Sequence, residues 1–193
     1  MSSLTNDFKG LMEKVEAGRE FGHASFEPIY YLIFAPSQIL DVKRELPAWI
    51  ATLKNKGWDV SIFSMTQAIQ ELFDSMPPFI KKTWTAQDAK SPLDWEKTNK
   101  SLAEAVNKKG ALQSQLEKKL KELEEEPKAI LLITDTEALH PYIRIGSIES
   151  QLYGKFKVPT IILYPGVSTG KTQLKFLGFY PEDGNYRSVH HGG

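Results

Sequence analysis

Residues 29–35 read IYYLIFA, an uninterrupted run of apolar, β-branched and aromatic side chains. Three more such runs follow: WDVSIFSM at 58–65, AILLITD at 129–135 and TIILYPG at 160–166. Short apolar runs of this kind are typical of strands that are buried on both faces, as in a parallel sheet. The four runs therefore predict the core strands of a mainly parallel sheet.

Helical patterns occupy the segments between these strands. In residues 39–53 apolar side chains recur on one face, and Gly57 can end that helix. Pro47 falls inside the pattern, so it must kink the helix or split it. SMTQ at 64–67 fits a capping box that begins a second helix, and the apolar spacing over 145–152 predicts a third. This alternation predicts an α/β fold with right-handed crossovers.

Two regions lie outside this core. Residues 1–18 predict an N-terminal helix with apolar side chains on one side. Residues 79–127 form a long helical insertion before the strand at 129–135. Its first part, KKTWTAQDAKSPLDW at 81–95, predicts an exposed connector. Its second part predicts two helices, or one bent helix, with the break at Gly110.

The end of the insertion carries a narrow apolar stripe on a highly charged segment. The stripe consists of Leu112, Leu116, Leu120 and Leu123. Two interpretations fit it: a helical hairpin that rests on the domain edge, or a helix that docks a partner protein. The chain length suits one domain, so we predict a single α/β domain over 1–193, with 79–127 as an insertion within it.

The chain ends LKFLGFYPEDGNYRSVHHGG. Residues 174–180 and 186–190 predict two strands, and Asp183-Gly184 between them is a strong hairpin signal. We expect this C-terminal β-hairpin to extend one edge of the sheet. The predicted fold class is α/β: a mainly parallel sheet of four core strands flanked by helices, with a helical insertion and a C-terminal β-hairpin.

The stretch GVSTGKT at 166–172 is similar to a phosphate-binding loop. Such a loop needs Gly-x-x-x-x-Gly-Lys-Ser/Thr between a strand and a helix, so that backbone N–H groups can wrap the phosphates. Here Gly166 and Gly170 are separated by three residues, one too few, and the following TQLKFLGFY alternates like a strand. The sequence therefore favours a polar turn with Lys171 in solvent. A degenerate phosphate loop would make the chain a divergent nucleotide-binding, ATPase-like domain, which is the alternative function.

Acidic residues follow the third predicted strand. Asp135 stands where nucleotide hydrolases hold Mg²⁺, and Glu137 could orient a nucleophile. In the other interpretation, Asp135 or Thr136 caps the next helix. Arg144 could pair with either carboxylate or with an anion, and ligands of open α/β sheets bind outside the carboxyl ends of strands. Asp135, Glu137, Arg144 and Lys171 are therefore the candidate ligand pocket.

The sequence contains no complete catalytic or metal-binding constellation. There are no cysteines, and the four histidines lack metal-ligand spacing. No Gly-x-Ser-x-Gly motif offers a nucleophile elbow. We expect no catalytic residue, no metal site and no cofactor, and therefore a protein that is not an enzyme.

Composition narrows the function classes further. Basic and acidic residues balance at 24 each, which gives no electrostatic reason to expect direct binding to nucleic acid. No apolar run approaches the roughly 20 residues that span a bilayer, and the N-terminus lacks the pattern of a signal peptide. We expect a cytoplasmic protein that does not bind membranes.

Three stretches resemble the BrxB family of bacterial BREX phage-defence systems. They are YYLIFAPSQILDVKRELPAWIATLKNKGWDV at 30–60, LLITDTEALHPYIRIGSIESQLYGKFKVPTIILYPG at 131–166 and LKFLGFYPEDGNYRS at 174–188. The resemblance runs from about residue 4 to 190. Its most specific parts are LHPYIRIGSIESQL and FLGFYPEDGNYRS.

The resemblance implies a biological context and no transferable catalytic motif. BREX loci encode a DNA methyltransferase, the alkaline-phosphatase-like protein PglZ, a large ATPase and small accessory proteins, of which BrxB is one. The implied role is a non-enzymatic accessory or scaffold component that acts through protein–protein interaction. PglZ is the first partner to expect, followed by the methyltransferase and the large ATPase. Nucleotide hydrolysis would belong to the large ATPase.

Overall fold

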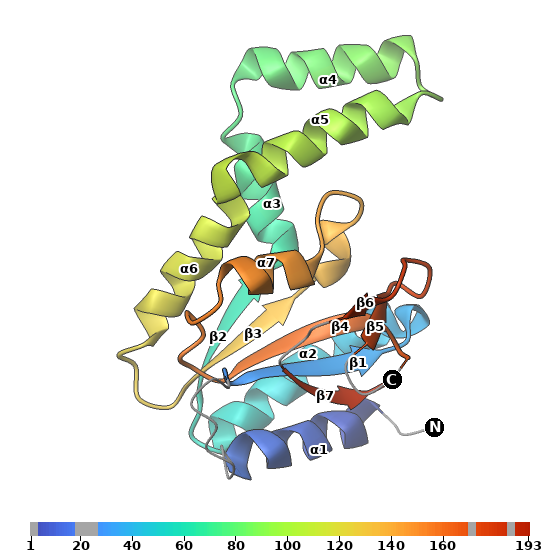
Figure 1. Cartoon of the computed structure of the whole chain (residues 1–193). Helices are drawn as coiled ribbons and strands as arrows, with labels where there is room; N and C mark the ends of the chain where they lie inside the picture. The colour runs from blue at the N-terminus through green and yellow to red at the C-terminus, as the bar shows by residue number, and fades with distance from the viewer. Residues whose placement is uncertain (1–3, 18–26, 170–172, 185–187) are drawn as a thin grey trace.

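A parallel sheet forms the centre of the molecule (Figure 1). The computed structural model describes residues 4–17, 27–169, 173–184 and 188–193. The four predicted core strands are confirmed, as β1 (Ile29–Phe34), β2 (Asp59–Ser64), β3 (Ala129–Thr134) and β4 (Thr160–Ser168). A further strand, β7 (Val189–Gly192), completes the order β2-β3-β4-β1-β7, and every neighbouring pair is parallel.

Helices cover both faces of this sheet (Figure 1). One face is covered by α1 (Leu4–Ala17) and α2 (Ile39–Asn55), the other by α3 (Met65–Asp74), α6 (Ala111–Leu123) and α7 (Ile145–Gln151). Successive strand residues point to opposite faces, so that in β1 Tyr30 packs with α1 and α2 whereas Tyr31 packs with the other layer. The predicted fold class is confirmed.

The boundaries of the second and third helices follow the sequence signals. A short 3₁₀ turn, η1 (Pro36–Gln38), leads into α2, which continues through Pro47 and is not split there. Ser64 precedes α3, and its Oγ accepts a hydrogen bond from the backbone N–H of Gln67 at 3.3 Å. The N-cap half of the predicted capping box is thus confirmed, whereas the Gln67 side chain donates to Glu71 Oε1 at 3.0 Å. Because Ser64 is also the last residue of β2, strand and helix join without a loop.

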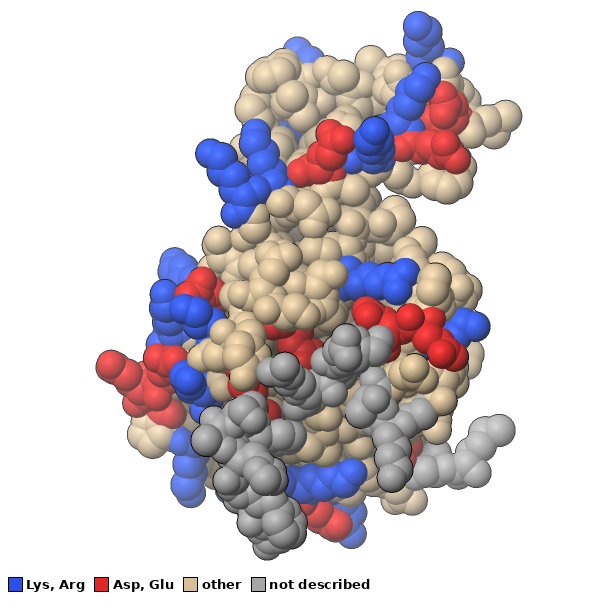
Figure 2. Space-filling model, in the orientation of Figure 1, with Lys and Arg blue, Asp and Glu red and all other residues tan. Residues whose placement is uncertain are grey.

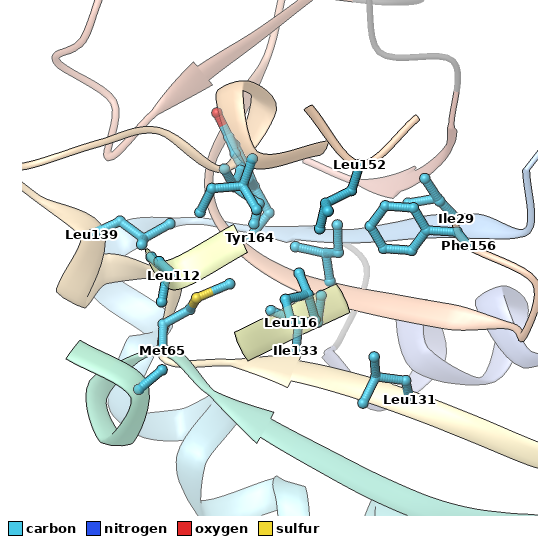
Figure 3. Packing of buried hydrophobic residues seen from close by; sticks show 14 of the residues in the cluster. Ile29, Met65, Leu112, Leu116, Leu131, Ile133, Leu139, Leu152, Phe156 and Tyr164 are labelled. Atoms are coloured by element: carbon cyan, nitrogen blue, oxygen red, sulfur yellow. The ribbon is translucent and has the colours of Figure 1, made fainter. Parts of the chain in front are cut away.

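The leucine stripe of α6 lies in the core. All four of its leucines are buried, and Leu112 and Leu116 belong to the same cluster as Met65 and Ile133 (Figure 3). The face of the sheet that this cluster covers is apolar and must be shielded from water. The stripe therefore stabilises the fold, and the interpretation that it docks a partner is wrong.

The predicted exposed connector is mostly a helix. α4 (Pro78–Lys90) and α5 (Trp95–Asn107) lie against each other and extend away from the sheet (Figure 1). Apolar residues of α4 do not recur on one face, so the pattern on which the prediction relied is missing there. The predicted break at Gly110 is confirmed: this glycine ends η2 (Lys108–Gly110) with a φ of 62°. We call residues 78–110 the arm.

The C-terminal strands pair differently from the prediction. β5 (Gln173–Phe176) is antiparallel to the end of β4, and β6 (Asp183–Gly184) is antiparallel to β5. Asp183 and Gly184 are thus strand residues and not the turn of a hairpin. The expected strand at 186–190 corresponds in its described part to β7, which lies parallel to β1. A local turn signal cannot reveal such a long-range pairing.

Candidate functional site

A charged cluster lies at the carboxyl ends of β2 and β3, under α2. We define it as Lys43, Ser64, Thr134, Asp135 and Glu137. The Lys43 Nζ atom is 2.8 Å from Asp135 Oδ1 and 2.8 Å from Glu137 Oε1. Asp135 Oδ2 accepts hydrogen bonds from the hydroxyls of Ser64 at 2.7 Å and Thr134 at 2.8 Å. One lysine thus neutralises one charge of a carboxylate pair.

The topology brings these residues together. α2 begins after β1 and crosses one face of the sheet to β2, so its second turn passes near the end of β3, two positions away from β1. That turn carries Lys43. Asp135 and Glu137 directly follow β3, and Ser64 ends the neighbouring strand β2. No sequence pattern indicated Lys43, because its position beside the two acids depends on the strand order.

Asp135 has an unusual backbone conformation. Its φ of 57° and ψ of 35° are left-handed, which costs a non-glycine residue on the order of 1 kcal/mol. The side chain does not cap η3 (Thr136–Leu139), and the Thr136 hydroxyl donates to the backbone carbonyl of Leu163 at 2.7 Å. The capping interpretation is therefore wrong for both side chains. Instead, this conformation aims the Asp135 carboxylate at Lys43 and Ser64.

The electrostatics of the cluster favour its charged form. Burial raises the pKa of Asp135, but hydrogen bonds from Lys43, Ser64 and Thr134 outweigh it, and the pKa lies below the ordinary value. The same hydrogen bonds to Asp135 and Glu137 raise the pKa of Lys43. Lys43 and Asp135 are therefore both held in their charged forms. Lys43, Asp135 and Glu137 form a closed ion-pair network, in which Lys43 Nζ lies 2.8 Å from each carboxylate.

The cavity beside Lys43 and the two carboxylates has a small volume. A cavity of about 20 Å³ is lined by Lys43, Asp135 and Glu137 and by apolar residues of β1, α2 and β4. It has room for about one water molecule. Small-molecule pockets measure roughly 300–1,000 Å³. This cavity is too small to admit a nucleotide.

Arg144, the third residue of the candidate ligand pocket, does not join the cluster. Arg144 lies over the ring of Tyr180, 4.4 Å from its centroid, and donates to the backbone carbonyl of Pro181 at 3.3 Å. Within the described residues it forms no ion pair with Asp135 or Glu137. Lys171 lies outside the described residues. Of the three candidates that the structure describes, it therefore brings together only the two acids.

The two most specific family-like stretches meet in an aromatic cluster. We define it as His140, Arg144, Phe179 and Tyr180. The Tyr180 hydroxyl forms a hydrogen bond with His140 Nδ1, and the ring of Phe179 stacks on Tyr180 with centroids 4.8 Å apart. Phe179 remains 63% exposed. The contacts join η3 and the start of α7 to the segment after β5, so these stretches support each other's structure.

Glu149 of α7 is partly buried. The hydroxyl of Tyr31, which is fully buried in β1, donates to Glu149 Oε2 at 2.5 Å. Burial raises the pKa of Glu149 to about 7, and the nearby carboxylates of Glu27 and Asp183 act in the same direction. Its protonation state can therefore change near neutral pH. No sequence pattern indicated this group, since Tyr31 is 118 residues away.

The glycine of GVSTGKT has a packing role. Gly166 lies in β4 opposite Phe176, and a Cβ there would come within 2.6 Å of the Lys175 carbonyl oxygen and 2.5 Å of the Tyr164 ring. Gly170 to Thr172 lie outside the described residues. The next described element is β5, a strand, whereas a phosphate loop is followed by a helix. Gly166 thus allows β4 and β5 to approach each other closely.

Other chemistry is sparse in the described part of the chain. No group of three or more His, Asp or Glu side chains there could hold a metal ion. Among the same residues, none of the helices has the length and apolar character to cross a membrane.

Comparison with known proteins identifies a family through the part of the fold that begins in β2. Neither a curated protein nor a solved structure matches the chain significantly. A family model does: the one described as BREX protein BrxB matches residues 61–190, more than half of the 193 residues. The match includes the arm, both family-like stretches of the aromatic cluster, and Asp135 and Glu137.

Proposed function

Because the chain belongs to the BrxB family and is a component of a BREX phage-defence system, we propose that it is a non-enzymatic accessory subunit. It acts through protein–protein interaction and helps to assemble the defence complex. Family membership is the observation that carries this proposal. We expect the protein to work in the cytoplasm together with the other products of its locus.

The state of the charged cluster supports a role without catalysis. General acid–base catalysis needs a group whose protonation can change in the reaction and a site that a substrate can reach. Here Lys43 pairs with both carboxylates at 2.8 Å, and the adjoining cavity is about 20 Å³. The cluster is better suited to fixing α2 and η3 at the end of the sheet than to turning over a substrate.

The partner to test first is PglZ, and the methyltransferase and the large ATPase come next. A tagged chain would be co-expressed with each protein in turn, captured and passed through size-exclusion chromatography. We expect at least PglZ to co-elute with it. If the chain associates with none of the BREX proteins, alone or co-expressed together, the scaffold role is refuted.

A variant of the charged cluster separates assembly from catalysis. Glu137→Gln keeps the shape of the side chain and removes its charge. We expect phage restriction and PglZ capture to stay within about twofold of the wild type. Loss of a catalytic acid or base would reduce restriction by a factor on the order of 100. Such a loss, with capture intact, would show that the protein is an enzyme.

The nucleotide-binding alternative has a direct test of its own. Wild-type protein would be heated with and without millimolar ATP or GTP and Mg²⁺. A ligand at 100 times its Kd stabilises a protein by about 2.7 kcal/mol, which is easily seen as a rise in Tm. We expect no rise. A rise that Asp135→Asn abolishes would overturn the proposal in favour of a divergent nucleotide-binding domain.

A further inference from the structure

The arm has the least internal support of any part of the fold. None of the 13 residues of α4, all of which the structure describes, is buried. α4 is held to α5 by single contacts: Trp84 Nε1 donates to Ser101 Oγ at 2.9 Å, and Thr98 Oγ1 donates to Asp88 Oδ1 at 2.7 Å. Isolated helices of this length are marginal in water. The arm therefore keeps its extended position without a core of its own.

Large apolar side chains lie at the tip of the arm. Leu93, in the link between α4 and α5, is 93% exposed, and Trp95, the first residue of α5, is 59% exposed. Both residues lie in the part of the arm that is farthest, along the chain, from the strands of the sheet. Tryptophan is enriched among the residues that dominate binding energy, because it buries a large rigid surface. The tip thus has the composition of a docking anchor.

The arm differs from the rest of the molecule in charge. It contains seven lysines and four acidic residues, a net charge of +3, so the remaining 17 basic and 20 acidic residues give −3. Figure 2 shows lysine side chains spread over the arm at the top of the view. Of the seven lysines, only Lys97 forms an ion pair with a described residue. The arm therefore offers positive charge that a partner can complement.

We propose that the arm docks onto an acidic face of another BREX protein, with Leu93 and Trp95 inserted in an apolar groove of that face. This inference rests on the proposed function, since it names the surface that a scaffold would use. A charge-complementary face steers association, and the apolar tip supplies the affinity. Arms of two copies would meet with like charge, which disfavours self-association through this surface.

The test uses full-length variants that leave the core untouched. Leu93→Ser and Trp95→Ser remove the tip. Leu40→Ser is the matched control, because Leu40 is an equally apolar side chain, 64% exposed on α2. Lys82→Glu with Lys100→Glu reverses charge on the arm, and Lys9→Glu with Lys54→Glu makes the same change on α1 and α2, where all four lysines are exposed. Tm values check that each variant folds.

Purified BREX proteins of the locus, PglZ first, are the binding probes. We expect the tip variants and the arm charge variant each to weaken capture about tenfold or more, and the controls to stay within twofold. Wild-type binding should also weaken as salt rises from 0.05 to roughly 0.5 M.

Each other outcome contradicts the inference in a recognisable way. If the wild type binds a BREX protein and the tip variants bind equally well, the arm is not the docking surface and the scaffold role stands. If the wild type binds none, the proposed function itself fails. If nuclease treatment abolishes capture, the arm binds nucleic acid. If the wild type is a dimer and the tip variants are monomers, its occupant is a second copy.

Discussion

At the scale of single residues, Lys43 determines the charge balance at the end of the sheet. It faces two carboxylates at once, and Asp135 is held toward it in a left-handed backbone conformation. Lys43 is 46% exposed, so water screens the ion pairs and their contribution to stability is modest. Its larger effect is to offset the electrostatic repulsion between the carboxylates of Asp135 and Glu137.

Lys43→Met tests this account. We expect the free energy of unfolding at pH 7 to fall by about 1 kcal/mol. The folded-state pKa of Asp135 lies below the ordinary 3.8, so Asp135 contributes stability above that pH and the contribution is lost as the pH falls through the folded value. The deficit of the variant should therefore shrink in acid. Urea unfolding from pH 7 to pH 3 measures both effects.

A matched substitution controls for the loss of a lysine. Lys56→Met removes one ion pair with Glu16, 2.7 Å long, at a similarly exposed position directly after α2. We expect a smaller loss, within about 0.5 kcal/mol. Equal losses in the two variants would mean that the cluster is an ordinary surface ion pair. NMR titration should also find the pKa of Asp135 higher in Lys43→Met than in the wild type.

Glu149 predicts a second pH dependence with the opposite sign. Its pKa is raised from 4.5 to about 7, chiefly by burial. The native state therefore keeps a proton that the unfolded chain releases, and wild-type stability falls as the pH rises from 4.5 to 7. Glu149→Gln can still accept the Tyr31 hydrogen bond but does not ionise. Its stability relative to the wild type should rise between pH 5 and pH 8, by up to about 3 kcal/mol.

Denaturant unfolding at several pH values measures this difference. Glu13→Gln, an exposed residue of α1, is the control and should keep a constant difference from the wild type. A constant difference for Glu149→Gln as well would show that Glu149 titrates like a solvated glutamate. Burial against Tyr31 would then have no energetic consequence.

The sequence predicted where candidate residues lie along the chain, but not which side chains they contact. Asp135 and Glu137 were correctly placed together at the end of a strand, since that follows from the chain itself. Lys43 was missed because it reaches them only through the path of α2 across the sheet. Gly166 belongs to the stretch for which the sequence favoured a polar turn over a phosphate loop, and the close approach of the Lys175 carbonyl explains why a glycine stands there. Partners of side chains depend on topology, which one sequence does not reveal.

At the scale of elements, apolar periodicity decided which parts could be predicted. The four core strands have uninterrupted apolar runs, and their observed bounds lie within two residues of the prediction. The sequence predicted a connector in place of α4, because this helix has no buried residues and therefore no apolar face. β7 was assigned to a hairpin because its true partner, β1, is more than 150 residues away.

Identical leucine substitutions in α6 and the arm should have opposite consequences. Leu116 is fully buried in α6, so Leu116→Ala should lower the free energy of unfolding by about 2–5 kcal/mol. Leu93→Ala, at the exposed tip of the arm, should change it by less than about 0.5 kcal/mol. Chemical denaturation compares the two. A cost of more than 1 kcal/mol for Leu93→Ala would mean that the arm packs against the body in solution.

At the scale of the whole molecule, a rigid three-layer body carries a weakly supported, oppositely charged arm. The body has two apolar clusters, one on each face of the sheet, whereas the arm has few buried side chains between its two helices. Local opening requires less free energy where fewer buried contacts must break. The molecule should therefore open from the arm, while the sheet stays intact.

Amide hydrogen exchange across the chain tests this division. We expect peptides from α4 to exchange first and those from β1 and β4, which lie inside the sheet, to exchange last. Binding of a BREX partner should slow exchange in α4 and α5 and leave β4 unchanged, because docking covers the arm only. If α4 were as protected as β4 in the protein without a partner, the arm would already be covered. A second copy of the chain would then be bound to it. If partner binding instead protected α1 and α2, the docking surface would lie on the face of the sheet that these two helices cover, and not on the arm.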